Sequence, residues 1–265
     1  MVEAQHVTYR AGGRDLIAAI DARFEPGKVH LVIGPNGAGK STLIKVLARL
    51  LRPHGGRVLY GGADVAQAGE RDLARTRAVL SQAIEVAFPL TVREVVTMGR
   101  YPHFGSRPTG RDAAIIDEVM TYFEVADLAD RGYPTLSGGE KQRVNFARVL
   151  AQVWQPVAPQ SRVLFLDEPL TFLDIRHQLE FMSKIREFCA GGDLIVIGVV
   201  HDLNLAARFA DRLLLIDRGR VAARGTREEV LTPANVRAAF GVEPIALPMP
   251  GELGTQLAFT VAARP

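Results

Sequence analysis

The chain has 265 residues, of which 48% are hydrophobic, and its charged side chains nearly balance at a formal net charge of +3. This length suffices for one large core with a smaller subdomain, and the scattered charge gives no indication of nucleic acid as the main partner. The single cysteine, Cys189, excludes an intramolecular disulfide. The sequence starts without a basic and apolar leader, and its longest strongly apolar run, residues 194–200, is too short to cross a bilayer. We therefore expect a cytoplasmic protein unless a partner tethers it to a membrane.

The chain opens with a predicted strand pair, residues 2–23, which would cover a nucleotide base. Tyr9 lies in this pair. A strand tyrosine usually packs into the core, but its place upstream of the next motif favours stacking on adenine, worth about 1 kcal/mol.

A phosphate-binding loop follows the strand pair. Residues 34–41 match the pattern G-x-x-x-x-G-K-S, after the apolar strand 29–33 and before a helical pattern that runs to residue 50. Glycine lets such a loop curl around the β-phosphate, Lys40 reaches the β- and γ-phosphates, and Ser41 can ligate Mg²⁺. The strand–loop–helix order indicates a nucleoside triphosphate site.

The middle of the chain is predicted to be helical, as a subdomain of about residues 90–150 inserted in the core. Apolar residues recur at three-to-four spacing from Thr91 to about Gly132, and Pro89 and Pro134 mark the ends of that stretch. Gln82 ends a short apolar run just before it and could touch both Mg²⁺ and the attacking water. Tyr101, His103 and Phe104 form either a contact surface for a partner or a locally packed cluster.

A second helix start of the anion-binding kind lies at residues 136–143, which read Leu-Ser-Gly-Gly-Glu-Lys-Gln-Arg. Free backbone N–H groups and the helix dipole favour an anion at such a start. One nucleotide does not obviously need two of these starts. We therefore expect the nucleotide to be held between two copies of the chain.

Two further strands deliver polar side chains. The apolar run 162–166 ends in Asp167 and Glu168, which predicts a carboxylate for Mg²⁺ and a general base for the attacking water. The run 194–200 ends in His201, which is either a packed or cap-adjacent histidine or, at the same sheet edge, a ligand of the γ-phosphate. The alternation of strands and helices after residue 162 indicates a parallel sheet.

The two remaining segments contain no motif that indicates a catalytic or binding role. Residues 154–162 contain two prolines and are predicted to be an exposed loop. The core is expected to be one domain over residues 1–241, and residues 242–265, rich in Pro and Gly, a short tail.

Together these motifs resemble the ATP-binding subunits of ABC transporters, from about residue 2 to residue 240, because other P-loop ATPases lack the run 136–143. The resemblance implies an α/β P-loop ATPase core with a parallel sheet, an N-terminal antiparallel β subdomain and an inserted helical subdomain. It implies ATP and Mg²⁺ as cofactors, a head-to-tail homodimer, and catalysis by Glu168, His201 and Gln82. The metal ligands it implies are Ser41, Gln82 and Asp167. The nucleotide contacts it implies are Tyr9, Gly34, Pro35, Asn36, Gly37, Ala38, Gly39, Lys40, Ser41, Thr42, Ser137, Gly138, Gly139 and Asp174. Phe172, two residues before Asp174, stands where the family often has alanine.

The cargo is predicted from a narrower resemblance. Residues 82–104 resemble the group of importers for iron chelates, cobalamin and haem, and the segments 150–154 and 201–208 favour haem over ferric siderophores and cobalamin. This implies a separate membrane permease dimer, a periplasmic haem-binding protein behind it, and a place at the cytoplasmic face of the bacterial inner membrane. Direct haem contact by a histidine of this chain is not expected. The alternative of another class is a soluble ABC ATPase without a permease, serving assembly or DNA repair.

Overall fold

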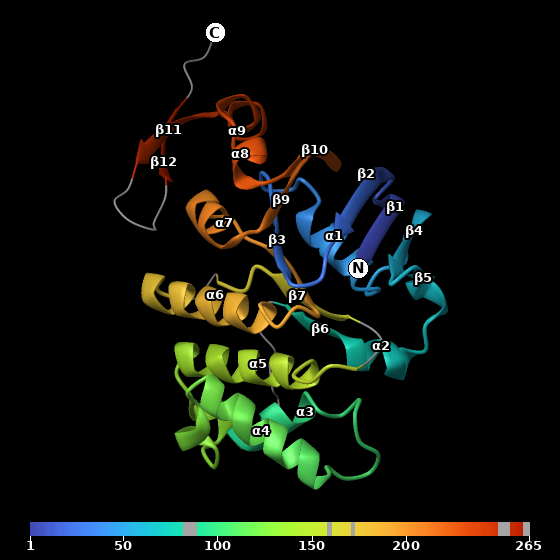
Figure 1. The fold of residues 1–265 in the computed structure, drawn as a ribbon, viewed down its shortest axis with the longest axis vertical. Coiled ribbons are helices and arrows are strands. Elements are labelled where there is room, and N and C mark those ends of the chain that lie inside the picture. Colours follow the sequence, from blue (N-terminus) through green and yellow to red (C-terminus); the bar gives the residue numbers. More distant parts are fainter. Residues whose placement is uncertain (82–88, 158–160, 171–172, 249–254, 262–265) are drawn as a thin grey trace.

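The computed structural model describes residues 1–81, 89–157, 161–170, 173–248 and 255–261. In these residues two sheets enclose a helix, a group of helices lies at one end of the long axis, and a small hairpin lies at the other (Figure 1). The arrangement is the predicted α/β fold, and the antiparallel N-terminal sheet and the inserted helices are both present.

The N-terminal sheet is antiparallel and contains more than the predicted strand pair. Its order is β2-β1-β4-β5. Its strands are β1 (Val2–Ala11), β2 (Arg14–Phe24), β4 (Gly55–Tyr60) and β5 (Ala63–Asp64). The last two strands have few apolar residues at alternate positions, so periodicity does not reveal them.

The main sheet has the order β10-β9-β3-β8-β7-β6, and all its neighbouring strands are parallel except β10 and β9. Its strands are β3 (Lys28–Ile33), β6 (Arg77–Leu80), β7 (Arg162–Asp167), β8 (Leu194–Val199), β9 (Arg212–Asp217) and β10 (Arg220–Gly225). The central strands β7 and β8 are buried along their whole length, which explains their unbroken apolar runs.

Each face of the main sheet packs into its own core. Val163 and Phe165 of β7 join the core that holds α1 (Lys40–Leu47) between the two sheets. Leu164 and Leu166 point to the opposite face, which α6 (Ile175–Cys189) covers. Further helices are α2 (Glu70–Thr76), α7 (Leu203–Phe209), α8 (Arg227–Val230), α9 (Pro233–Phe240) and the 3₁₀ turn η1 (Val65–Gln67).

The helical group consists of α3, α4 and α5, which pack on one another. Each begins with a capping box, in which the side chains of the first cap residue and of the acidic residue three positions on bond each other's backbone N–H. The bounds are α3 (Val92–Met98), α4 (Gly110–Tyr122), α5 (Gly138–Gln152) and the 3₁₀ turns η2 (Ala126–Leu128) and η3 (Tyr133–Thr135).

Two segments differ from the sequence-based expectation. The C-terminal tail contains an antiparallel hairpin of β11 (Val242–Pro248) and β12 (Thr255–Val261). The segment after α5 is not simply an exposed loop, because Trp154 stacks on Phe188 with ring centroids 4.8 Å apart and donates to Glu118. Burial of a large aromatic ring is favourable enough to keep its segment against the protein even when the neighbouring residues are polar.

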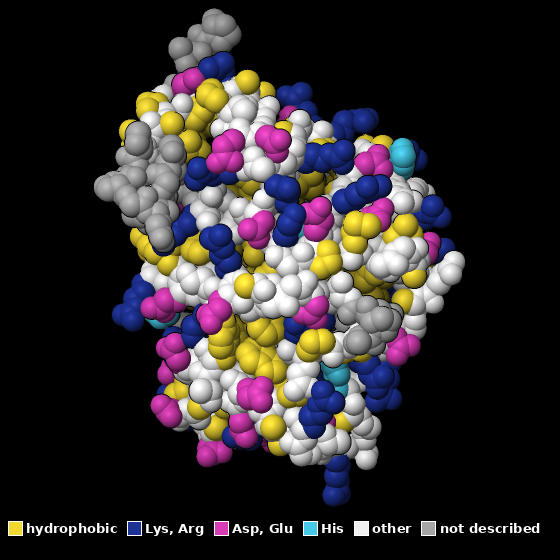
Figure 2. Space-filling model, viewed as in Figure 1, with side chains coloured by type: hydrophobic (Ala, Val, Ile, Leu, Met, Phe, Trp, Pro, Cys, Tyr) yellow, Lys and Arg dark blue, Asp and Glu magenta, His cyan; other side chains and the backbone are white. Residues whose placement is uncertain are grey.

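The surface agrees with the balanced charge of the sequence. On the face shown in Figure 2, basic and acidic side chains are interspersed among polar ones. Within the described ranges, no helix has both the length and the apolar character needed to span a bilayer.

Candidate functional site

The predicted site residues converge because of the strand order. The phosphate loop follows β3, His201 is the second residue after β8, and Asp167 ends β7. These three strands are parallel neighbours in the order β3-β8-β7. The carboxyl ends of parallel strands meet at one edge of a sheet, where ligands of such folds bind. The structure thus brings residues from three distant parts of the chain to one edge.

The phosphate loop wraps around the start of α1, and two of its glycines have steric reasons within the chain. Gly34 has a φ of +148° and Gly39 one of +101°. A Cβ at Gly34 would lie 2.0 Å from the Ile216 carbonyl oxygen, and one at Gly39 would lie 2.4 Å from the Leu16 carbonyl oxygen. Only glycine tolerates both the backbone angle and this close approach.

Lys40 is the charged group at the centre of this loop. Its side chain is buried, and its Nζ donates to the carbonyl oxygens of Gly34 at 2.8 Å and Pro35 at 2.9 Å. Burial lowers the pKa of Lys40, while the nearby carboxylates of Glu168 and Asp167 raise it in part. The Lys40 ammonium and the carboxylates of Asp167 and Glu168 therefore lie near enough to interact electrostatically.

Glu168 and His201 are in direct contact. Nε2 of His201 lies 2.7 Å from Oε1 of Glu168. Glu168 also has a φ of +52°, a left-handed conformation that costs a non-glycine residue about 1 kcal/mol or more. Backbone strain of this kind clusters at functional sites, and here it accompanies the predicted general base.

Asp167 fits the predicted metal site. Its side chain is buried, and its Oδ1 has no hydrogen-bond partner among the described residues. An unpartnered buried carboxylate oxygen is costly unless a cation or a water compensates it, and oxygen ligands are those that Mg²⁺ prefers. Asp167 at one strand end and the Ser41 hydroxyl at the start of α1 are therefore suitable Mg²⁺ ligands.

Tyr9 lies on β1, half-buried, and opposes Ile17 on β2. Its ring meets that of His54 edge-on, with centroids 5.0 Å apart. The backbone around Ile17 borders Gly39, so Tyr9 is one strand away from the phosphate loop. Stacking of Tyr9 on adenine stays a prediction.

The second helix start, at α5, is built differently from the phosphate loop. The Ser137 side chain accepts from the Glu140 N–H at 3.3 Å, and Glu140 Oε2 accepts from the Ser137 N–H at 2.7 Å. A Cβ at Gly138 or Gly139 would meet no described atom within 4 Å. The packing of the single chain therefore gives no reason for glycine at these two positions.

Asp174 occupies the cap of another helix. Its carboxylate accepts from the His177 N–H at 2.9 Å and pairs with the His177 ring, so it fixes the start of α6. Its predicted role across a dimer stays a prediction. Gln82 and Phe172, which also carried predictions, lie outside the described residues.

Two glutamines near the site carry contacts that the sequence did not predict. Gln142, on α5, donates to the Pro169 carbonyl at 2.8 Å, directly after Glu168. Gln178, on α6, donates to the Leu173 carbonyl at 3.0 Å, directly before Asp174. The Gln142 bond joins two elements that tertiary packing brings together, so no local sequence pattern predicts it, whereas the Gln178 bond is local to the start of α6.

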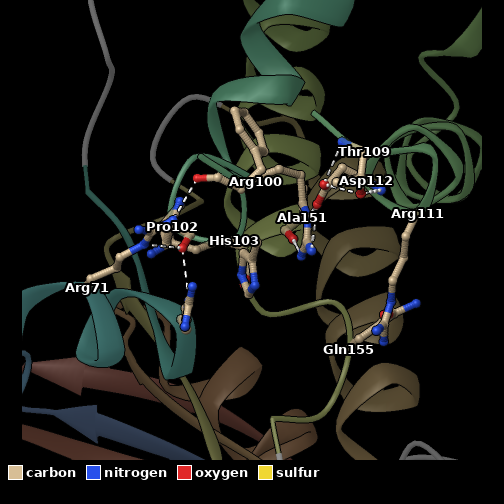
Figure 3. A network of polar contacts seen from close by, with 12 residues as sticks. Arg71, Arg100, Pro102, His103, Thr109, Arg111, Asp112, Ala151 and Gln155 are labelled. Atoms are coloured by element: carbon tan, nitrogen blue, oxygen red, sulfur yellow. Dashed lines mark hydrogen bonds and ion pairs between the residues drawn. The ribbon is translucent and has the colours of Figure 1, made fainter. Parts of the chain in front are cut away.

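The end of α5 is tied to the segment 99–109 by buried polar contacts (Figure 3). Arg100 donates to Asp112 at 3.1 Å and to the Ala151 carbonyl at 2.9 Å, and His103 Nε2 lies 2.7 Å from the Gln152 carbonyl. His103 therefore points inward. Of the predicted aromatic cluster, Tyr101 is 57% exposed and its ring meets that of Phe104, which is buried.

The fold and this site define a nucleoside triphosphatase of the P-loop class. Residues 17–171 match the family model described as ABC transporter. The chain belongs to the ABC transporter family, as an ATP-binding subunit that hydrolyses ATP in transport.

Curated relatives resemble the chain over nearly its whole length. "Hemin import ATP-binding protein HmuV" of Gloeobacter violaceus is 45% identical over 250 residues, which is 94% of this chain and 90% of the relative. The protein of the same name from Bordetella avium is 42% identical over 256 residues, which is 97% of this chain and 98% of the relative. Among solved structures, the ADP conformation of an ATP-binding cassette of an ABC transporter matches with a TM-score of 0.77 at 22% identity, over 89% of this chain and 97% of that one. The last likeness shows the fold alone.

Proposed function

We propose that this chain energises haem uptake as the ATP-hydrolysing subunit of a bacterial importer, acting on a separate membrane permease dimer at the cytoplasmic face of the inner membrane. The observation that carries the chemistry is the 2.7 Å contact between His201 and Glu168 at the sheet edge that also holds Lys40. The cargo rests on the hemin import proteins, which are more than 40% identical to this chain over most of its length.

In this proposal Glu168 accepts the proton of the water that attacks the γ-phosphate. His201 holds the Glu168 carboxylate in place and contacts the γ-phosphate, while Lys40 moves its ammonium from the loop carbonyls to the β- and γ-phosphates. Asp167 and Ser41 would hold Mg²⁺, with Gln82 as the further expected ligand. When bound, Mg²⁺ neutralises charge on the phosphate oxygens.

The active unit in this proposal is a head-to-tail homodimer in which α5 of one copy closes over the ATP of the other. The exposed Ser137 and Gly138 support this, since the open space at Gly138 and Gly139 leaves their backbone N–H groups accessible to a phosphate. Tyr9 would stack on the adenine, and Asp174 would act at the interface between the copies.

The permease would contact the helical group near the exposed Tyr101. The segment 99–109 is tied to the end of α5 through Arg100 and His103, so a displacement of α5 on dimer closure would move the same segment. A periplasmic haem-binding protein would deliver the cargo to the other side of the permease.

The experiment compares wild type with Glu168→Gln, together with the permease in liposomes that contain a haem-loaded binding protein. We expect Glu168→Gln to keep ATP binding and to lose roughly 10²- to 10⁴-fold in hydrolysis, and haem uptake with it. Glu124→Gln, which changes an exposed carboxylate paired with Lys184, is the matched control and should hydrolyse ATP as wild type does.

The outcomes test the assignment of ATP hydrolysis and the identity of the transported molecule separately. Wild-type hydrolysis in Glu168→Gln would contradict the assigned base. Uptake of a ferric siderophore or cobalamin in place of haem would overturn the cargo alone, and hydrolysis that never responds to any permease would favour the soluble ATPase.

A further inference from the structure

The C-terminal hairpin is attached to the body of the protein at two places. At its base, the Arg237 guanidinium of α9 bonds both carboxylate oxygens of Glu243, at 2.6 and 2.7 Å. Farther along, β12 contacts α7, the short helix that begins two residues after His201 (Figure 1). The hairpin therefore touches an element that belongs to the candidate active site.

The contact with α7 is made by one side chain that forms two hydrogen bonds. Asn204 Nδ2 donates to the Leu257 carbonyl at 3.1 Å, and the Leu257 N–H donates to Asn204 Oδ1 at 2.7 Å. The amide thus bonds β12 as a neighbouring strand would, satisfying the outward N–H and C=O of one residue. Both groups are partly buried, so removal of the Asn204 side chain would leave the Leu257 N–H and C=O without these hydrogen bonds in a place that water reaches poorly.

Asn204 is also connected to His201 by the first turn of α7. Its backbone N–H donates to Asp202 Oδ1 at 2.7 Å, and the Leu205 N–H donates to the same oxygen at 3.1 Å. Asp202 follows His201 directly, and His201 Nε2 lies 2.7 Å from Glu168 Oε1. Hydrogen bonds link the hairpin to Asn204 and Asn204 to Asp202, and Asp202 is joined by a peptide bond to His201, which contacts the Glu168 carboxylate.

We infer that Asn204 is a positioning residue through which the C-terminal hairpin holds α7, and with it His201, in register with Glu168. This inference rests on the proposed function, because it assigns His201 and Glu168 to ATP hydrolysis. His201 is 47% exposed, so few packing contacts restrain its ring and the hold on its helix matters. The C-terminal hairpin then contributes to ATP hydrolysis by keeping His201 in position.

The test compares steady-state ATP hydrolysis by the full-length wild type, Asn204→Ala and Asn204→Asp. Asn204→Ala should lower kcat about threefold to tenfold, the range expected for a lost hydrogen bond, while KM for ATP stays within about twofold because the phosphate loop is untouched. Asn204→Asp keeps the acceptor for the Leu257 N–H but sets a carboxylate oxygen against the Leu257 carbonyl, so its kcat should fall at least as far as that of Asn204→Ala.

Two further measurements distinguish positioning from a general loss of structure. Hydrogen exchange at the Leu257 amide should speed up in Asn204→Ala. In a His201→Ala background, Asn204→Ala should leave the residual single-turnover rate unchanged, because the effect passes through His201. Glu124→Gln, at an exposed pair with Lys184 that belongs neither to the hairpin nor to α7, is the control and should keep the wild-type kcat.

The kcat values of these variants decide between the inference and its alternatives. A lowered kcat with unchanged KM, lost in the His201→Ala background, supports the inference. If wild type hydrolyses ATP and Glu168→Gln does not, yet Asn204→Ala matches wild type, this inference fails and the proposed function stands. An equal loss in the His201→Ala background also overturns it, and a wild type without any ATP hydrolysis overturns both.

Discussion

The two helix starts that can bind phosphate are held in different ways. At α1, carbonyl oxygens of Leu16 and Ile216 press against the glycines of the loop, so the chain itself requires the loop geometry. At α5, Gly138 and Gly139 face open space, and the capping box of Ser137 is the local support. The first start is therefore shaped by contacts within its own chain, whereas no contact among the described residues requires glycine at the second.

The C-terminal end of α5, unlike its start, is held by contacts with other parts of the chain. There the Ala151 and Gln152 carbonyls are bonded by Arg100 and His103, and Arg100 is paired with the buried carboxylate of Asp112. The helix is thus anchored at its end and open at its start. A displacement of the start of α5 would therefore also move the segment 99–109, which is bonded to the end of the same helix.

The largest expected loss of stability comes from cutting this anchor. Asp112→Asn leaves the Arg100 guanidinium buried without a countercharge, so the free energy of unfolding should fall by about 3–5 kcal/mol. Thermal and urea unfolding measure this. Asp117→Asn, at an exposed pair with Arg93, is the control and should cost less than about 1 kcal/mol. Equal losses in the two variants would contradict the anchoring role.

The same carboxylate predicts a pH dependence. Burial by itself raises the pKa of Asp112, but hydrogen bonds from Thr109 and the Arg100 guanidinium outweigh it and leave that pKa below its ordinary value. A depressed folded pKa gives stability that is fully present above about pH 4 and is lost as the pH falls through the folded pKa. Unfolding measured between about pH 2 and pH 6 should show a weaker acid loss for Asp112→Asn than for wild type.

The next prediction compares a glycine of the phosphate loop with a glycine of α5. Gly39→Ala places a Cβ 2.4 Å from the Leu16 carbonyl oxygen at a φ of +101°, so it should cost about 2 kcal/mol or more. Gly138→Ala should change stability by less than about 1 kcal/mol, because alanine favours a helix and meets no described atom. It should nevertheless lower ATP hydrolysis about 10- to 100-fold, since a methyl group would keep the partner's phosphate from the backbone. Full hydrolysis by Gly138→Ala would show that nothing approaches α5 closely.

The sequence predicted the part of the site that is local in the chain. The phosphate loop and the acid pair that ends β7 have fixed spacings, because one loop or strand end makes each geometry, and the strand order then brought Lys40, Glu168 and His201 together as expected. The contacts of Gln142, Arg100 and Asn204 join elements far apart in sequence, so no spacing encodes them. The hairpin was missed because Pro and Gly suggested a tail, while its strands are stabilised by each other and by α7.

A further test concerns the residue that caps α5. Ser137→Ala removes one cap and should cost about 1 kcal/mol. Thr91→Ala removes the matching cap of α3, where Thr91 and Glu94 form the same capping box, and should cost a similar amount.

The two variants should differ in hydrolysis, because the Ser137 hydroxyl is exposed at the helix start that we propose to meet the γ-phosphate of the other copy. A lost hydrogen bond to a charged group predicts about a tenfold or larger fall in kcat for Ser137→Ala and none for Thr91→Ala. Measuring unfolding and hydrolysis on both proteins separates the cap from the ligand contact. If both lose hydrolysis equally, the hydroxyl acts only as a cap, and the open start of α5 would need another explanation.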